Sequence, residues 1–460
     1  MSDAVPAELT PEMTLDVSSH RRRLLDALPD DGLVILFAGQ PLLRTADEHY
    51  RYAPSHNYYY LTGLDRENQV LVLTRRGSER TEAVFIEAVD SHAEAWTGQM
   101  MTADEARFLS NIDDVQTVDR WIPYVNRLIE SGRFPCVYLD LERRTWSGAP
   151  SDAIRFAHRL VEKHPGTAVR NAFPLMAELR RIKSAGEIAR VRAAVAHTKQ
   201  GLAALIAHAR PGLREFQLNG HFTGTLIGGG ARLAYPPIIA AGANAAVLHY
   251  TTLRDTVQSG DLVLVDAAAE FGYYKADITR TFPIDGTFTE EQRAIHDLVG
   301  EASQAVLAAM RPGVPHKELQ RITRQVLGRG MKALGYLRDE SDIGSYYFHG
   351  VSHYLGLDTH DVGEHRELES GMVLTVEPGL YLKEKGLGVR IEDDVVITAD
   401  GIEVLSANIP KDARAMERWM AELQATRDGD RSRTTGGASA DSTPQLARGG
   451  RADPHSLPLS

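Results

Sequence analysis

The stretch that decides the fold reads LVLVDAAAEFGYYKADITRTF and covers residues 262–282. Its apolar start and end predict an antiparallel hairpin with a turn at residues 271–272. Asp266 and Asp277 are equidistant from that turn, so we expect them to face each other with Cβ atoms about 4.5–5.5 Å apart. Two carboxylates that close repel unless one is protonated or a cation lies between them. The hairpin therefore indicates a metal site or an acid pair.

A second stretch, VLTVEPGLYLKEKGLGVRIEDDVVIT at residues 373–398, repeats this arrangement. Glu377 and Glu392 are equidistant from a turn at residues 384–385, so they too can face each other. One pair of strand carboxylates is usually a solvated face. Two pairs in corresponding places would bring four carboxylates to one interface, which divalent cations stabilise. Oxygen ligands of this kind suit Mn²⁺ or a similar hard ion.

The two hairpins belong to a weak internal repeat. The segment AALIAHARPGLREFQLNGHFTGTL at 203–226 resembles AVLAAMRPGVPHKELQRITRQVL at 305–327. Each predicts a helix that stops at Arg-Pro-Gly and a second amphipathic helix, and a capping-box sequence precedes each, at 184–187 and 289–292. Two helix hairpins could share such stop signals by chance. The acid-bearing hairpin that follows each one favours a duplicated, pseudo-two-fold α+β domain.

The rest of the chain divides by composition. Apolar runs and one helical stretch in the first third predict an α/β domain: strands at 33–37, 70–74, 83–87 and 137–140 and a helix at 102–109. The last residues carry no aromatic side chain and too few apolar ones to offset the entropy of ordering. We therefore predict an α/β domain at 1–172, a catalytic domain at 173–424 and a disordered tail at 425–460.

Composition excludes several classes of protein. The 460 residues carry a formal net charge of −11, which does not suit a nucleic-acid binder. The single cysteine, Cys136, cannot form an intrachain disulfide. The first residues lack the apolar stretch of a secretory signal or a membrane span. We expect a cytoplasmic protein with neither nucleic acid nor membrane as a partner.

A dense histidine segment, HGVSHYLGLDTHDVG at 349–363, lies between the two acidic hairpins. His349 and His353 have i,i+4 spacing, but the neighbouring glycines argue against a helix. A lone histidine is more often a core or surface residue than a ligand. The chain has no H-E-x-x-H, G-x-S-x-G or G-x-x-x-x-G-K-[ST] motif, so zincin, serine-hydrolase and P-loop chemistry are unsupported.

Taken together, these motifs resemble the pita-bread metallopeptidases and, within them, the aminopeptidase P family of Xaa-Pro aminopeptidases. The resemblance covers roughly residues 15–424. HGVSHYLGLDTHDVG, TVEPGLYL and VRIEDDVVIT stand in the family's order, and YYYLTG at 58–63 and AWTG at 95–98 resemble its N-terminal domain. The resemblance implies an α/β N-terminal domain followed by a pita-bread catalytic domain. That first domain argues against methionine aminopeptidases, which resemble the catalytic half alone.

The resemblance also implies two divalent metal ions, with Mn²⁺ expected ahead of Co²⁺ or Zn²⁺. Asp277 and Glu392 would bridge both ions, Asp266 would bind one, and His353 and Glu377 would bind the other. A hydroxide bridging the ions would attack the peptide bond, with Glu377 as proton shuttle.

The remaining site residues are also assigned by resemblance. His249 and His360 would contact substrate or stabilise the tetrahedral intermediate. His349 would line the proline pocket, and Tyr381 and Arg390 would orient metal ligands.

Two assignments have a competing structural explanation. Arg180 matches an arginine near the distal substrate site, or it is a solvated charge at a helix start. Trp96 matches a tryptophan that reaches the active site of a neighbouring subunit in a homo-dimer or tetramer, or it is an ordinary buried aromatic residue.

Three functions remain open. The first is a Xaa-Pro aminopeptidase acting on proline-containing peptides; the second is a prolidase restricted to Xaa-Pro dipeptides. Ser352 favours the first, because prolidases more often resemble HGxGH at that position. The third is a metal-free pita-bread binding module, which the presence of all five ligand residues disfavours.

Overall fold

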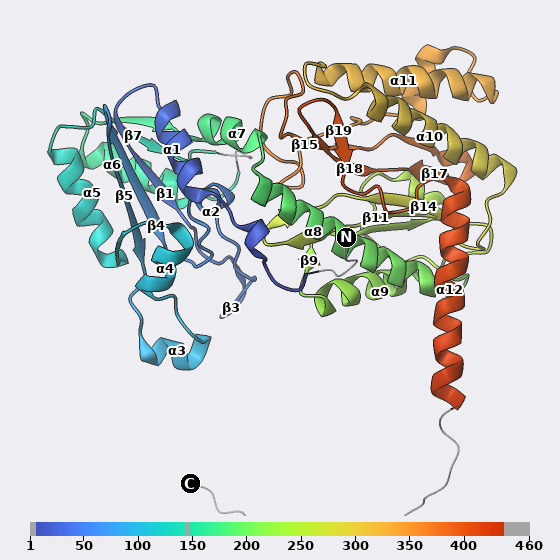
Figure 1. Ribbon diagram of the computed structural model, residues 1–460, viewed down its shortest axis with the longest axis horizontal. Coiled ribbons are helices and arrows are strands. Elements are labelled where there is room, and N and C mark those ends of the chain that lie inside the picture. The colour runs from blue at the N-terminus through green and yellow to red at the C-terminus, as the bar shows by residue number, and fades with distance from the viewer. Residues whose placement is uncertain (1–5, 143–146, 437–460) are drawn as a thin grey trace, which may run out of the picture.

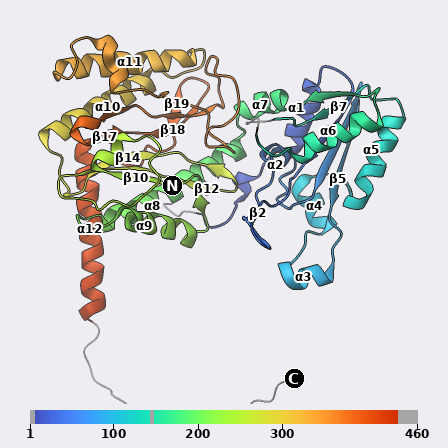
Figure 2. The ribbon, with the colours of Figure 1, turned by 180° about the vertical axis from the view of Figure 1, so that it is seen from behind.

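The structure is a computed structural model that describes residues 6–142 and 147–436. Figures 1 and 2 show two lobes side by side, with the N-terminal elements in one lobe and α8 to α12 in the other. In the described ranges, no helix is both long enough and apolar enough to cross a membrane.

The N-terminal lobe is a mixed six-stranded sheet with the order β6-β5-β4-β1-β7-β8 and helices on both faces. Successive residues of a strand point to opposite faces. Leu33 and Ile35 of β1 therefore pack against α5 and α6, whereas Val34 and Leu36 pack against α1, α2 and α4. The lobe consists of α1 (Val17–Ala27), β1 (Gly32–Phe37), β2 (Leu43–Thr45), β3 (Glu48–His49), α2 (His56–Thr62), β4 (Val70–Arg76), β5 (Glu79–Ile86), α3 (Ser91–Thr97), α4 (Ala103–Ser110), β6 (Asp114–Thr117), α5 (Trp121–Glu130), β7 (Cys136–Leu139), α6 (Asp152–Lys163), β8 (Ala168–Asn171) and α7 (Phe173–Arg181).

The second lobe contains the two predicted halves, each a helix pair followed by strands. Capping boxes at Ser184 and Thr289 begin α8 and α10. The first half consists of α8 (Ala185–His208), α9 (Glu215–Gly228), β9 (Arg232–Leu233), β10 (Ile238–Ala241), β11 (Leu262–Asp266), β12 (Ala269–Phe271), β13 (Tyr274–Lys275) and β14 (Thr279–Pro283). The second half consists of α10 (Glu290–Ala309), α11 (His316–Ala333), β15 (Val373–Val376), β16 (Gly379–Leu382), β17 (Leu387–Arg390), β18 (Asp393–Ile397) and β19 (Ile402–Val404), followed by α12 (Ala413–Gly436).

The register of the first hairpin corrects our prediction. Asp266 pairs with Thr279, not with Asp277, so the two aspartates are diagonal neighbours rather than opposite each other. The hairpin turns at Gly272 and Tyr273, whose φ angles are +55° and +70°, as in a type I′ turn. The predicted turn lies one residue earlier, and the residue type gives no sign of the shift, because tyrosine rarely adopts a positive φ. Diagonal neighbours about 7–8 Å apart at Cα still share one face of the hairpin.

The register of the second hairpin is as predicted. Val376 pairs with Asp393 and Gly379 pairs with Arg390, which places Glu377 opposite Glu392. The two hairpins meet through β14 and β17: the Thr281 hydroxyl donates to the Arg390 carbonyl at 3.0 Å and accepts from the Arg390 N–H at 3.2 Å.

The C-terminal helix differs from our expectation for the tail. Helix α12 runs to Gly436, past the point at which we predicted disorder to begin. The side chains of Gln424 and Arg427 donate to the carbonyls of Ala209 and Ala207 at the end of α8. Helical hydrogen bonds are local, so the low apolar content of this segment does not prevent a helix. Residues 437–460 lie outside the described residues, and for them the disordered tail stays a prediction.

Candidate metal centre and active site

The structure brings the five predicted metal ligands into one cavity of about 450 Å³. Its wall includes the carboxylates of both hairpins and histidines from two separate loops: Asp266, Asp277, Glu377, Glu392, His249, His349, His353 and His360, with Arg390. Ligand atoms of Asp277, His353 and Glu392 all lie within 4.8 Å of one another, which is close enough for one ion to bind all three.

The two aspartates of the first hairpin meet at a tyrosine. The hydroxyl of Tyr235, which precedes β10, lies 2.7 Å from Asp266 Oδ1 and 2.6 Å from Asp277 Oδ1. Behind the pair, Asp394 Oδ2 accepts a hydrogen bond of 3.1 Å from the Asp277 N–H. The first hairpin therefore presents two carboxylates to the cavity although they are not opposite each other in the register.

The second hairpin is connected to the first through Thr279. The Thr279 hydroxyl donates to Glu392 Oε2 at 2.6 Å and accepts from Arg390 Nε at 3.1 Å. Arg390 also donates from Nη2 to Asp266 Oδ2 at 2.6 Å. This ion pair with Asp266 favours the charged form of the buried guanidinium. Arg390 thus holds one carboxylate directly and a second one through a hydroxyl.

His353 presents a lone pair to the carboxylates. Its Nδ1 lies 2.9 Å from the carbonyl oxygen of Tyr354, which can only accept, so Nδ1 carries the proton and Nε2 carries the lone pair. Nε2 lies 3.5 Å from Asp277 Oδ2 and 3.4 Å from Glu377 Oε1. Burial lowers the pKa of His353 to about 4, so the ring is neutral at pH 7 and forms no ion pair with these oxygens.

The carboxylates themselves are poorly stabilised as anions. Burial, and then the charge of Asp266, raises the pKa of Asp277. Burial and the charge of Glu392 raise the pKa of Glu377, and burial and the charge of Asp277 raise that of Glu392. Arg390 lowers the pKa of Glu377 and of Glu392 but does not outweigh burial and the neighbouring carboxylates, so additional positive charge would stabilise this group of anions.

These donors fit divalent metal ions. Four carboxylates and a neutral imidazole nitrogen that all point to one volume repel one another as acceptors, and Arg390 compensates only part of that charge. Carboxylate oxygen with one imidazole is the donor set that Mn²⁺, Co²⁺ and Zn²⁺ accept.

A chain of hydrogen bonds connects His349 to the ligand set. His349 Nδ1 lies 2.7 Å from the Gly350 carbonyl oxygen, so Nε2 accepts from the Tyr381 hydroxyl at 2.9 Å. That hydroxyl in turn accepts from Arg390 Nη1 at 2.9 Å. Burial lowers the pKa of His349 to about 4. The ring is therefore neutral and held in one orientation beside the carboxylates.

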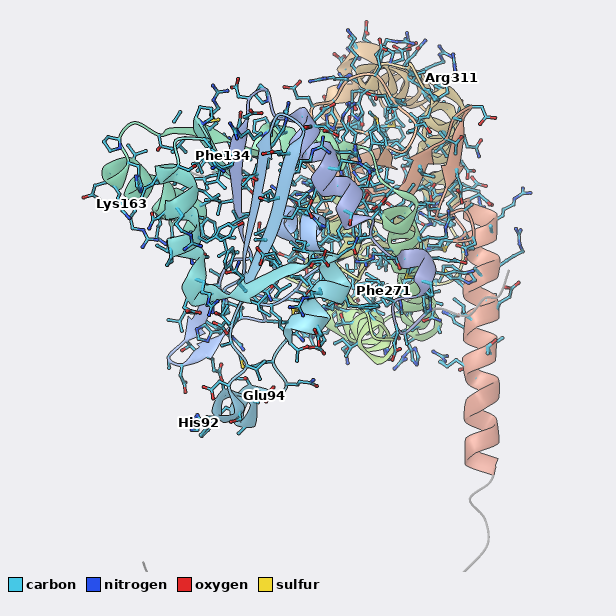
Figure 3. All side chains as sticks on the ribbon, turned by 60° about the vertical axis from the view of Figure 1, so that its left-hand side comes forward. His92, Glu94, Phe134, Lys163, Phe271 and Arg311 are labelled. Carbon is cyan, nitrogen blue, oxygen red and sulfur yellow. The ribbon has the colours of Figure 1, made fainter. Side chains whose placement is uncertain are left out.

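The structure excludes the structural alternatives that we considered for Arg180 and Trp96. Arg180 is only 3% exposed at the end of α7, so it is not a solvated charge, and it is absent from the wall of the cavity. Trp96 is 81% exposed on α3, so it is not an ordinary buried aromatic residue. Figure 3 shows α3, marked by His92 and Glu94, standing apart from the body of the molecule. Within one chain, Trp96 does not line the cavity.

Sequence reasoning missed several contributors to the site. Thr279 follows Asp277 by two residues and so shares its face, which strand alternation could have indicated. Tyr235 and His365 carry no such signal, because their neighbours in sequence form no repeat or motif with the acidic hairpins.

Comparison with known proteins agrees with this geometry. Residues 189–399 match the family model of metallopeptidase family M24, and residues 17–138 match that of the aminopeptidase P N-terminal domain. A Xaa-Pro aminopeptidase of Escherichia coli K12 is 33% identical over 87% of this chain and 96% of its own length. A putative aminopeptidase P from Bacillus anthracis has a TM-score of 0.87 at 39% identity, with 88% of this chain and 98% of that chain covered. Zinc-substituted E. coli aminopeptidase P in complex with product has a TM-score of 0.80 at 31% identity, with 90% and 99% covered.

The chain therefore belongs to metallopeptidase family M24. Its N-terminal lobe matches the aminopeptidase P N-terminal domain, and two bacterial relatives that it matches along nearly their whole length are named Xaa-Pro aminopeptidases. The predicted fold, an α/β N-terminal domain with a pita-bread catalytic domain, and the predicted class of enzyme, a metallopeptidase of the aminopeptidase P type, are confirmed.

Proposed function

We propose that this protein is a dinuclear-metal aminopeptidase that hydrolyses the bond between an N-terminal residue and a following proline in peptides. The observation that supports the proposal most directly is the convergence of both hairpins and His353 on one cavity. The Xaa-Pro aminopeptidases among its relatives supply the substrate class.

In this proposal two divalent ions would share Asp277 and Glu392 as ligands, Asp266 would hold one ion, and His353 and Glu377 would hold the other. Mn²⁺ is the proposed ion, with Co²⁺ and Zn²⁺ as alternatives. Ions bound there would supply a water of lowered pKa and a polarised peptide carbonyl.

The remaining steps fall to side chains of the chain. Glu377, whose pKa is raised by burial and by Glu392, is suited to take up a proton and pass it to the proline nitrogen as the peptide bond breaks. His249 and His360 lie in the cavity wall, where a ring N–H can stabilise negative charge on the carbonyl oxygen. His349, fixed by Tyr381, offers a ring face to the proline side chain. A cytoplasmic homo-oligomer, dimer or tetramer, in which Trp96 reaches a neighbouring subunit, belongs to the same proposal.

The test is a comparison of three substrates after removal and return of metal. Purified protein treated with chelator should be inactive, and Mn²⁺ should restore cleavage of a Xaa-Pro-Xaa tripeptide. A Xaa-Ala-Xaa tripeptide should be a poor substrate. Cleavage of Xaa-Pro dipeptide with none of the tripeptide would instead identify a prolidase, and activity that resists complete metal removal would refute the proposal.

A further inference from the structure

A second group of buried charges lies beside the cavity and belongs to none of the roles proposed above. Arg180 and Lys183, at and just after the end of α7, are 3% and 5% exposed. They face Asp358 and Asp361, which flank His360 in the loop between α11 and β15. Buried cations and acids are retained in proteins only where they are paired.

One guanidinium nitrogen holds both acids. Arg180 Nη2 donates to Asp358 Oδ2 at 2.8 Å and to Asp361 Oδ1 at 2.5 Å. Lys183 Nζ lies 2.9 Å from the other oxygen of Asp361. The residues on both sides of His360 are thus tied to the same short segment of chain.

The same guanidinium reaches into the N-terminal lobe. Arg180 Nη1 donates to Asn57 Oδ1 of α2 at 2.9 Å, and His56 Nδ1 lies 3.1 Å from Asp358 Oδ1. Asn57 in turn donates to Asp140, just after β7, at 2.7 Å. The cluster therefore joins the sheet of the N-terminal lobe to the loop that carries His360.

The loop has little else to fix it. Residues 356–363 form no helix or strand. Their backbone hydrogen bonds are the Gly356 N–H to the Asp358 carbonyl, the Asp361 N–H to the Tyr354 carbonyl and, at the start of the loop, the Lys275 N–H to the Gly356 carbonyl, so none reaches His360 itself. A Cβ at Gly356 would overlap Asp361 and lie close to Lys183, so the loop backbone packs directly on the charged pair. The position of His360 consequently depends on how its neighbours are held.

The pKa shifts of Arg180, Asp358 and Asp361 favour the charged form of each buried group. Burial lowers the pKa of Arg180, but Asp361 and Asp358 outweigh it and raise that pKa overall. Burial raises the pKa of Asp361, but Arg180 and Lys183 lower it overall. Burial likewise raises the pKa of Asp358, but His56 and Arg180 lower it overall. A guanidinium presents its donors in a rigid planar fork, whereas the three donors of an ammonium rotate at the end of a flexible stem and fix their partners less well.

We propose that Arg180 is a positioning residue for His360, whose guanidinium fixes the turn from Asp358 to Asp361 and sets it against the N-terminal lobe. The inference rests on the proposed function, in which His360 contacts the reacting carbonyl. In this inference Arg180 acts through His360, and not through the distal substrate site that the family resemblance implies for it.

A double-mutant cycle tests this role. His360→Ala should lower kcat by about 10²–10³-fold through loss of a transition-state donor. Arg180→Lys should lower kcat by up to about 10²-fold through displacement of that donor, with metal content and KM nearly unchanged. The double variant should be no slower than His360→Ala alone, because a donor that is absent cannot be displaced. Additive losses would overturn the proposal.

If Arg180→Lys does not fold, Asp358→Asn can take its place in the double-mutant cycle. That substitution weakens the contact between Arg180 and the loop while it keeps the size of the side chain. Arg21→Lys is the matched control. Arg21 is a fully buried guanidinium in the N-terminal lobe, paired with Glu82 at 2.7 Å and remote from the His360 loop. It should destabilise the lobe without changing kcat, and its effect should be independent of His360.

Hydrogen–deuterium exchange of the full chain separates this inference from the proposed function. Arg180→Lys should speed exchange of the amides in 354–363, and Arg21→Lys should not. If exchange of these amides is unchanged in Arg180→Lys, the positioning role of Arg180 is refuted, even if the enzyme is active. A wild-type protein that hydrolyses no Xaa-Pro substrate would refute the proposed function, while the exchange result would still decide whether Arg180 fixes the loop.

Discussion

The hydroxyl of Thr279 donates a hydrogen bond of 2.6 Å to Oε2 of Glu392, although the two residues belong to different hairpins. Thr279 is fully buried and Glu392 is only 2% exposed. The hydrogen bond from Thr279 of β14 therefore fixes the orientation of Glu392 without help from a bound ion. A change of charge at this carboxylate can therefore be made with little change of shape.

Glu392→Gln should lower the amount of metal bound per chain and nearly abolish hydrolysis. The amide keeps the size of the side chain but removes one of the charges that ions compensate. The loss should exceed the roughly 10–100-fold effect typical of residues that only orient a ligand. Elemental analysis after dialysis and steady-state kinetics at saturating Mn²⁺ would measure both.

Glu403→Gln on β19 is the control for that variant, because Glu403 is paired with Arg192 at the surface and lies outside the cavity. It should keep both metal and activity. If Glu392→Gln binds two ions per chain and remains active, the bridging role is refuted.

The metal-free protein should lose stability as pH rises from about 4, the unfolded carboxyl value, through the raised folded pKa values. Burial and neighbouring carboxylates raise the pKa values of Asp277, Glu377 and Glu392 in the folded state. The folded chain then binds protons that the unfolded chain has lost, so the free energy of unfolding falls as pH rises through the folded pKa values. This penalty is absent below about pH 4, the unfolded value.

Buried histidines contribute to the pH dependence of stability with the opposite sign. The pKa of His353 is lowered to about 4 by burial, so its contribution rises between about pH 4 and 6.5 and is constant above that. Across about pH 4.5–8.5 in chelator, the melting temperature of wild type should therefore fall relative to that of Glu392→Gln, because the histidine contribution is common to both proteins. Saturating Mn²⁺ should remove the difference in slope, and parallel slopes in chelator would contradict the shifts.

Tyr235→Phe should weaken metal binding by about 10–100-fold without preventing catalysis. Its hydroxyl contacts both Asp266 and Asp277, so its loss removes one restraint from each carboxylate, although Arg390 still holds Asp266. The Mn²⁺ concentration for half-maximal activity should rise, and excess Mn²⁺ should restore kcat. Tyr274→Phe is the matched control, because the buried hydroxyl of Tyr274 donates a hydrogen bond to Glu187 and lies outside the cavity. An unaltered Mn²⁺ requirement in Tyr235→Phe would show that the hydroxyl does not orient the pair.

Trp96→Ala should leave the melting temperature unchanged, because the indole is 81% exposed and its removal uncovers no core. It should lower kcat/KM if the side chain completes the site of a neighbouring subunit. Light scattering must show that the oligomer persists. Phe108→Ala on α4, where the phenyl ring is 86% exposed, is the control. Normal kinetics of an intact Trp96→Ala oligomer would leave this tryptophan without a catalytic role.

The apolar runs of the sequence predicted the central strands of the N-terminal sheet and missed its edges. β1, β4, β5 and β7 all appeared as apolar segments, and the structure places them next to one another. β6 and β8 form the two edges and are mostly polar and solvent-facing. Edge strands need only one partner and one covered face, so they leave no hydrophobic pattern to find.

The acidic hairpins show where local reasoning about the site stops. Symmetry about residues 384–385 gave the partner of Glu377 correctly, because the second hairpin has no irregularity that shifts the pairs. In the first hairpin, Tyr273 adopts a positive φ that its residue type does not predict. Tyr235 and Arg180 lie far from their partners in sequence, so only the folded chain reveals what they hold.

The tip of the first hairpin, at Gly272 and Tyr273, has a consequence for how the protein is made. Arg190 of α8 donates to the Gly272 carbonyl at 2.9 Å and to the Tyr59 hydroxyl at 2.6 Å, and the ring of Tyr273 lies 4.5 Å from that of Tyr59. During synthesis the N-terminal lobe emerges first, and domains generally fold in that order. Tyr59 would thus be in place before Asp266 and Asp277 leave the ribosome. The nascent hairpin would then meet a surface already shaped to receive its tip.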